Sequence, residues 1–481
     1  MADTSPASLA KQLLGILYKD RARLERIDDY LHGRHDDPYM PETADAEYKM
    51  LARRSVSNWM PLLVGTPAQA LCVDGFRRGL PGELPKGNDG STLPEWDHWE
   101  RSRLGARQAA VYRSALSYGH SFTLTEKAKG RVRSKGLSAM KTAALFEDPA
   151  NDEIPFAALT IVQQPRGDER GIARLWDARN EYRVTFKSLS DLDGVKVHNG
   201  RRHGSSECPV TRFAALVDLE GRTIGVIEPM IELQDRINQT VFDLLIAQTG
   251  GSFKVRYASG MAPPIKRDPE TGEPELDDQG NPKPLPINLN AKRFLFSEDA
   301  DVKFGTLDET PLGGYIESID MSIRHLAAVS QTPPHHLLGQ IANLSAEALL
   351  AAETALSRKI EEFRRVFSEA WERVFRLAAE LAGDAVSADD FHGEVLWRDM
   401  EQRSLAQSAD ALGKLAESLG VPKRGLWRRV PGVTQNEIDD WEDLREEEDA
   451  ELMLASSVRR ATTPAPAVRF SDVPSADRVA A

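Results

Sequence analysis

The chain has little of what disulfide-rich, secreted or membrane proteins need. Its 481 residues include only two cysteines, Cys72 and Cys208, which exclude a disulfide framework and a cysteine-rich zinc site. No apolar run reaches the ~18 residues that span a bilayer. The first residues, MADTSPASLAKQLLG, lack the basic and apolar regions of a secretory signal. We therefore expect a soluble protein of a reducing compartment.

Sequence motifs for nucleotide and metal chemistry are also missing. The chain contains no GxxxxGK[ST], GxGxxG, HExxH, GxSxG or CxxC, so a motor with a phosphate-binding loop is not expected. Three clusters resemble metal sites but lack a complete ligand set at suitable spacing. They are His32, His35, Asp36 and Asp37; Asp389, Asp390, His392 and Glu394; and His203 with Cys208. The sequence predicts no catalytic residue, no metal site and no cofactor.

An excess of positive charge is absent as well. The chain has 61 basic and 74 acidic side chains, a net charge of −13. Proteins that hold the phosphate backbone usually carry a basic excess. If this chain handles nucleic acid, we therefore expect it to bind weakly or to let the nucleic acid pass. A local exception lies between residues 249 and 312. It is either a solvated strand face, or a surface for phosphate contact or for docking of an acidic partner. Its basic residues are Lys254, Arg256, Lys266, Arg267, Lys292 and Arg293.

The first 226 residues have the patterns of helices followed by a sheet. Ser5 and Pro6 predict the cap of an amphipathic helix, and Gly119 predicts the end of a helix that begins near Trp96. Further helices are expected at 47–56 and 59–71. After Gly119 the apolar period changes to two, which predicts an antiparallel sheet. The strand candidates are 121–125, 156–162, 171–178, 181–188 and 195–198, with Asp193–Gly194 as a hairpin turn.

From residue 227 onward the order is helix, β-rich insertion, helix, polar loop, very long helix. The two helices that bracket the Pro-rich insertion cover 227–248 and 313–329, and each has one apolar stripe. The stripes are Met230, Leu233, Ile237, Val241 and Leu244, then Ile316, Ile319, Ile323 and Leu326. The long helix, 345–383, would reach roughly 57 Å. These patterns predict an α+β fold that is mainly α.

The polar loop TPPHHLLGQIANLS leaves two interpretations open. It either connects two helices with exposed imidazoles, or it is presented to a channel where neutral polar groups meet DNA without holding it. The candidate residues are His335, His336, Gln340 and Asn343. Shorter helices follow residue 384, and the composition from about 456 predicts disorder.

Three segments resemble the portal proteins of tailed bacteriophages, in the form found in long-tailed phages of Actinobacteria. One is IEPMIELQDRINQT, similar to the family's pattern through Glu228, Leu233, Gln234, Asp235, Ile237, Asn238 and Thr240. Another is VSQTPPHHLLGQIANLSAEAL, similar to the family's segment ahead of the long helix. The third comprises YLHGRHDDPYMP and NWMPLLVGTPAQALCVDGFR.

The resemblance implies an architecture for each part of the chain. Residues 1–226 with the long helix 345–383 would form the wing, 227–248 and 313–329 the stem, and 249–312 the clip. Residues 330–344 would hold the tunnel loop that faces DNA, 384–455 the helical crown, and 456–481 a disordered tail. Clip residues Lys254, Arg256, Lys266 and Arg267 would contact docking partners.

The resemblance also implies a function without chemistry of its own. Family members form rings, usually of twelve subunits, at one capsid vertex of the virion, after assembly in the host cytoplasm. Double-stranded DNA passes through the ring during packaging and ejection. Expected partners are the terminase large subunit, the head–tail connector, and the capsid and scaffolding proteins, without a membrane. A metal-dependent nuclease and another head–tail ring or adaptor protein are the alternatives.

Overall fold

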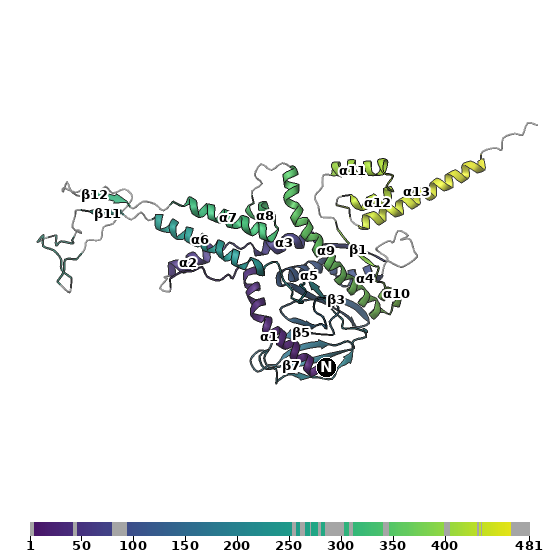
Figure 1. Ribbon diagram of the computed structural model, residues 1–481, viewed down its shortest axis with the longest axis horizontal. Helices are drawn as coiled ribbons and strands as arrows, with labels where there is room; N and C mark the ends of the chain where they lie inside the picture. Colours follow the sequence, from purple (N-terminus) through teal and green to yellow (C-terminus); the bar gives the residue numbers. More distant parts are fainter. Residues whose placement is uncertain are drawn as a thin grey trace, which may run out of the picture. The chain divides into compact units, whose positions relative to one another are not determined.

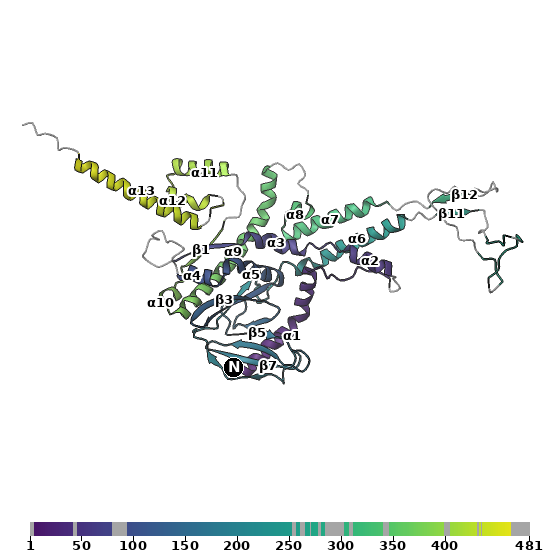
Figure 2. The ribbon, with the colours of Figure 1, turned by 180° about the vertical axis from the view of Figure 1, so that it is seen from behind.

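The computed structural model describes residues 4–41, 46–78, 94–252, 256–259, 265–269, 271–277, 280–283, 303–306, 311–339, 346–398, 405–430, 432–433 and 435–462. Within these residues, helices and antiparallel sheets are both present, which agrees with the predicted α+β class. No described helix combines the length and the apolar character that crossing a membrane requires. Figures 1 and 2 show the chain from opposite sides.

The chain divides into two compact units, each built from separate stretches of sequence. The first unit contains residues 1–34, 59–231 and 329–481, and the second contains 35–58 and 232–328. Most of the residues that the resemblance assigns to stem and clip, 232–328, therefore fall in the second unit, together with residues 35–58.

The first unit contains two antiparallel sheets in its N-terminal half, where the sequence predicts one. One has the order β10-β2-β3, from β2 (His120–Ala128), β3 (Arg131–Leu137) and β10 (Val210–Ala214). The other has the order β4-β5-β6-β7-β8, with β9 also paired to β7. Its strands are β4 (Thr142–Leu145), β5 (Ala157–Gln163), β6 (Gly171–Trp176), β7 (Asn180–Phe186), β8 (Lys196–Val197) and β9 (Arg201–Arg202). Strands β3, β4 and β10 are not among the strand candidates of the sequence. Asp193–Gly194 lies between β7 and β8 but not in a tight turn, because Thr185 pairs with Lys196.

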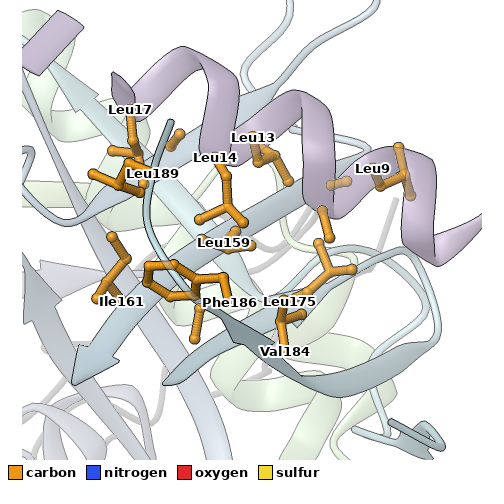
Figure 3. Packing of buried hydrophobic residues seen from close by; sticks show 14 residues of the cluster. Leu9, Leu13, Leu14, Leu17, Leu159, Ile161, Leu175, Val184, Phe186 and Leu189 are labelled. Atoms are coloured by element: carbon orange, nitrogen blue, oxygen red, sulfur yellow. The ribbon is translucent and has the colours of Figure 1, made fainter. Parts of the chain in front are cut away.

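Helix α1 (Pro6–Leu31) covers the larger sheet with the apolar face that its sequence predicts. Ser5 Oγ accepts the Ser8 N–H, so the predicted cap is formed. Leu9, Leu13, Leu14 and Leu17 pack against residues of β5, β6 and β7 in one buried cluster. Figure 3 shows Leu159, Leu175, Val184 and Phe186 beneath these leucines. Such burial is the main favourable term in folding.

The predicted helix from Trp96 to Tyr118 is two helices, α4 (Pro94–Arg101) and α5 (Leu104–Tyr118). Arg103 between them has φ +55°, a left-handed conformation that breaks the helical run. Gly119 ends α5 with φ +91°, as predicted. The other helices of this region are α2 (Ala46–Ser55) of the second unit and α3 (Met60–Ala70) of the first.

The long helix α9 (Ala346–Ala382) forms an aromatic core in the first unit. Phe363, Phe367, Trp371 and Phe375 are almost completely buried. Trp371 Nε1 donates to Tyr112 Oη at 2.7 Å, and its ring lies 4.6 Å from Phe213 and 4.9 Å from Trp99, centroid to centroid. The helix therefore packs on α4, α5 and β10 at once.

The segment after α9 is not purely helical, which changes the boundary expected at residue 384. After the short α10 (Ala385–Ala388), β13 (Glu394–Trp397) pairs antiparallel with β1 (Val73–Arg77). The purely helical part consists of α11 (Leu405–Ser418), α12 (Lys423–Leu426) and α13 (Gln435–Thr462). Because α13 continues to Thr462, the disorder expected from 456 is wrong for its first seven residues; residues 463–481 lie outside the described chain.

The second unit contains α6 (Ile231–Ser252) from residue 232 and α7 (Gly313–Ser330) up to residue 328. The two helices lie side by side in Figures 1 and 2. Arg236 Nη2 of α6 lies 3.1 Å from His325 Nδ1 of α7. Strands β11 (Arg256–Ser259) and β12 (Lys303–Thr306) pair antiparallel between the two helices in sequence. The predicted order of helix, β-rich insertion and helix is confirmed.

We predict that Gly119→Ala destabilises the protein more than Gly130→Ala. Both glycines have positive φ, +91° and +77°, so both substitutions carry the left-handed penalty of roughly 1–2 kcal/mol. A Cβ at Gly119 would also lie 2.7 Å from the Thr223 carbonyl oxygen, whereas nothing lies within 4 Å at Gly130. Calorimetry should show an additional loss of about 1–3 kcal/mol for Gly119→Ala. Equal losses would contradict this close approach.

Candidate functional site

The predicted polar loop begins with a short helix. Gln331 turns the chain at φ +55°, and α8 (Pro334–Leu338) follows with Pro334 in its first turn. Gly339 ends α8 at φ +64°, the left-handed conformation that glycine adopts most easily. The TPPHHLLG sequence is therefore a capped helical turn, and Gln340 and Asn343 lie outside the described residues.

His335 and His336 both point to one carboxylate on α9. His335 Nε2 lies 2.9 Å and His336 Nε2 lies 3.1 Å from Glu353 Oε1. The side chain of His335 is 11% exposed, that of His336 30% and that of Glu353 32%. The two rings meet edge to face, with centroids 4.5 Å apart. These imidazoles are held against α9, a partner that the sequence alone did not predict.

Two further hydrogen bonds hold the α8 region in place. Trp59 Nε1 donates to the Leu337 carbonyl oxygen at 3.3 Å, and Lys359 Nζ of α9 donates to the Ser330 carbonyl oxygen at 2.8 Å. Burial lowers the pKa of Lys359 below its ordinary value, because the charged amine loses hydration. Residues 330–338 are thus attached to α9 at two places and to Trp59 at a third.

The family-like pattern of α6 forms a buried polar network in the second unit. Gln234 and Asn238 are 0% and 1% exposed. Gln234 Nε2 donates to the Ser57 carbonyl oxygen at 2.7 Å and to Asn238 Oδ1 at 2.9 Å. Asn238 Nδ2 lies 2.8 Å from His35 Nδ1, and its Oδ1 accepts the Ser57 N–H at 3.3 Å. The segments IEPMIELQDRINQT and YLHGRHDDPYMP, which both carry the resemblance, therefore contact each other.

This network corrects the apolar stripe expected for α6. The buried positions of α6 are Ile231, Gln234, Ile237, Asn238 and Phe242. Of the predicted stripe, Met230 and Ile237 are buried, but the buried face turns toward Gln234 and Asn238. Phe242 packs with Leu51 and Ala52 of α2. Leu233, Val241 and Leu244 of the predicted stripe are only half-buried. An apolar strip of α6 is thus left partly uncovered within the single chain.

The insertion between α6 and α7 contains short β-like pairings, so its prolines do not prevent local order. Arg267 pairs with Pro274, and Leu276 pairs with Pro282. Lys266 Nζ forms an ion pair with Glu275 at 2.8 Å, and Arg267 Nη1 donates to the Gly272 carbonyl oxygen at 3.0 Å. Arg256 lies in β11, where it pairs with Thr306. Lys254, Lys292 and Arg293 lie outside the described residues.

Residues of the metal-like clusters take part in hydrogen bonds with backbone and side-chain groups. His32 Nδ1 lies 2.8 Å from the Asp28 carbonyl oxygen, and His35 contacts Asn238. His203 Nε2 lies 3.1 Å from the Asp177 carbonyl oxygen. Asp390 Oδ1 accepts the His392 N–H at 3.1 Å. Burial raises the pKa of the Cys208 thiol to about 12, which disfavours the thiolate that a metal would need.

Comparison with known proteins assigns the family. The model of the family described as phage portal protein, SPP1 Gp6-like, matches residues 10–451. The portal protein of Mycobacterium phage D29 is 26% identical over 413 residues, covering 81% of this chain and 78% of that protein. The portal protein of Mycobacterium phage L5 is 24% identical over 419 residues, with the same coverage. The chain belongs to the phage portal protein family, as the motifs predict.

We predict that Asn238→Ala loosens the segment 46–55 from α6. The substitution removes the partner of Gln234, Ser57 and His35, and a buried polar group left without a partner costs about 1–3 kcal/mol. Thr240→Ala is the matched control, because among the described residues Thr240 Oγ1 donates to the Arg236 carbonyl oxygen of its own helix alone. Hydrogen exchange of the α2 amides should accelerate in Asn238→Ala alone. Unchanged protection of α2 would contradict the assigned role of the network.

Proposed function

We propose that this chain is the portal subunit of a phage virion, forming a ring of twelve copies at one capsid vertex. The ring is the channel for genome packaging and ejection, and it docks the terminase large subunit and then the head–tail connector. It assembles in the host cytoplasm with the capsid and scaffolding proteins. The observation that carries the proposal is the family match over residues 10–451. It favours a portal over the nuclease and adaptor alternatives.

The architecture follows the order of the elements. We assign residues 1–226 with α9 to the wing, 227–248 and 313–329 to the stem, and 249–312 to the clip. Residues 330–344 are assigned to the tunnel loop. The crown corresponds to the helices after Trp397, because β13 pairs with β1 of the wing. The role needs no catalytic residue.

Uncovered apolar side chains on the stem helices support assembly into a ring. Ile316 and Met321 of α7 are 58% and 54% exposed, and α6 leaves Leu233, Val241 and Leu244 half-buried. A second copy of the same stem is the occupant that fits this strip, since neighbouring stems in a ring present the same helices. Burying apolar area yields about 25 cal/mol per Å², so twelve repeated contacts would stabilise the ring.

The net charge supports passage of DNA rather than capture. Each chain carries −13, so twelve copies carry 12 × −13 = −156. A basic wall would bind phosphates and release counterions, which opposes sliding. An acidic wall repels the phosphate backbone and keeps DNA in the lumen.

We assign His335, His336, Gln340 and Asn343 to the part of the tunnel loop nearest DNA, and Lys254, Arg256, Lys266 and Arg267 to partner docking at the clip. The contacts of the histidines with Glu353 limit how far they extend while α8 is in place. Lys266 is already paired with Glu275, so docking at the clip would have to compete with that ion pair or use it.

Native mass spectrometry and negative-stain imaging test the ring. Twelve copies of the 53.3-kDa chain give about 640 kDa, whereas a nuclease of the alternative class would be a small species that cleaves DNA with Mg²⁺. Ile316→Lys should shift the population to smaller species, because it places a charge in the stem contact. Leu219→Lys is the control, since Leu219 is 87% exposed in the first unit. A monomer under all conditions would refute the proposal.

A deletion tests the role of the clip separately from ring assembly. Replacing residues 266–284 with a short Gly-Ser linker should leave ring assembly intact and weaken binding of terminase or connector. Removal of 463–481, a deletion of equal length, should leave both unchanged. Binding can be measured by surface plasmon resonance on assembled rings. Loss of the ring itself on clip replacement would refute this assignment of residues 249–312.

A further inference from the structure

The histidine pair of α8 and Glu353 of α9 form a cluster with the composition of a metal site. Within the described part of the chain, their three ligand atoms lie within 4.8 Å of one another. Zinc binds imidazole nitrogen at about 2.0–2.1 Å and carboxylate oxygen at about 2.0–2.2 Å. Two such ligands at angles between 90° and 109° are about 3.0–3.4 Å apart. The observed separations from Glu353 Oε1, 2.9 and 3.1 Å, are close to that range.

The donor types select the class of metal. Two imidazole nitrogens and one carboxylate oxygen suit Zn²⁺ and its neighbours Co²⁺ and Ni²⁺, whereas Mg²⁺ and Ca²⁺ prefer oxygen ligands alone. The three side chains are 11–32% exposed. Water can therefore reach the cluster and supply a fourth ligand, as in zinc sites with three protein ligands.

The surrounding structure holds the donors before any ion arrives. Pro334 begins α8 and Gly339 ends it. Trp59 Nε1 donates to the carbonyl oxygen of Leu337, which lies between His336 and Gly339 in the sequence. In α9, Lys359 lies six residues after Glu353, and its Nζ donates to the Ser330 carbonyl oxygen. A donor set fixed in this way loses little conformational entropy when it binds.

We propose that His335, His336 and Glu353 bind a Zn²⁺-class divalent ion that fastens α8 to α9. The ion would accept one lone pair from each imidazole Nε2 and one from a Glu353 oxygen, with both imidazoles neutral. The local charge changes from −1 to +1 on binding. The proposal does not depend on ring formation.

The experiment uses the full-length chain without an affinity tag, treated with a chelator and then titrated with Co²⁺ or Zn²⁺. We expect one ion per chain, with a visible Co²⁺ spectrum of nitrogen and oxygen ligands. His336→Ala and Glu353→Gln should each weaken Zn²⁺ binding at least tenfold by calorimetry. His198→Ala is the matched control, because it removes an exposed imidazole whose one hydrogen bond within the described chain is to Thr185 Oγ1 at 3.3 Å. It should bind as the unaltered chain does.

Several results would overturn the site. The site would be overturned if the two variants bound Zn²⁺ as tightly as the unaltered chain. It would also be overturned if the unaltered chain took up no ion. A thiolate charge-transfer band would assign the ion to a cysteine instead. Either negative binding result would leave a hydrogen-bonded cluster without a metal. Circular dichroism of each variant checks folding, and zinc-dependent protection of α8 from hydrogen exchange in the unaltered chain tests the site without any substitution.

Discussion

The burial of Trp371 is the contact on which the first unit depends. Its indole is 0% exposed, donates to Tyr112 Oη, and packs against Trp99 and Phe213. These partners belong to α4, α5 and β10, so one side chain of α9 joins two helices and a sheet. Loss of a buried tryptophan typically costs about 3–5 kcal/mol. The three-stranded sheet and the helices α4 and α5 all share this one aromatic contact of α9.

In the second unit, α6 is held by buried polar contacts. Gln234 and Asn238 are buried and bond backbone groups of the segment before α3. Buried amides are costly when unpaired and specific when paired, so they define the register between α6 and that segment. Packing of Phe242 against Leu51 and Ala52 adds buried apolar area but does little to define this register. The family pattern in α6 thus has a structural reason: its Gln and Asn are contacts to a remote stretch of the same chain.

Local signals in the sequence predicted most element ends, and the failures occurred where partners are remote. Ser5 and Gly119 predicted their caps because the reason for each is local. Arg103 gave no signal, since a left-handed arginine between two helices depends on packing. The buried face of α6 was misjudged because an apolar period treats Gln234 and Asn238 as outward. Likewise, nothing near His335 identified Glu353 as a partner, because that contact depends on how α8 meets α9.

The division into interleaved units bears on how the chain is made. The Trp371–Tyr112 contact spans 259 residues of sequence, and the Asn238–His35 contact spans 203. The N-terminal partners therefore leave the ribosome long before the residues they bind. Contacts this distant in sequence slow folding, and partly folded chains of this size expose apolar surface that aggregates. Each unit must wait for residues that are synthesised late, so folding should be largely completed after translation.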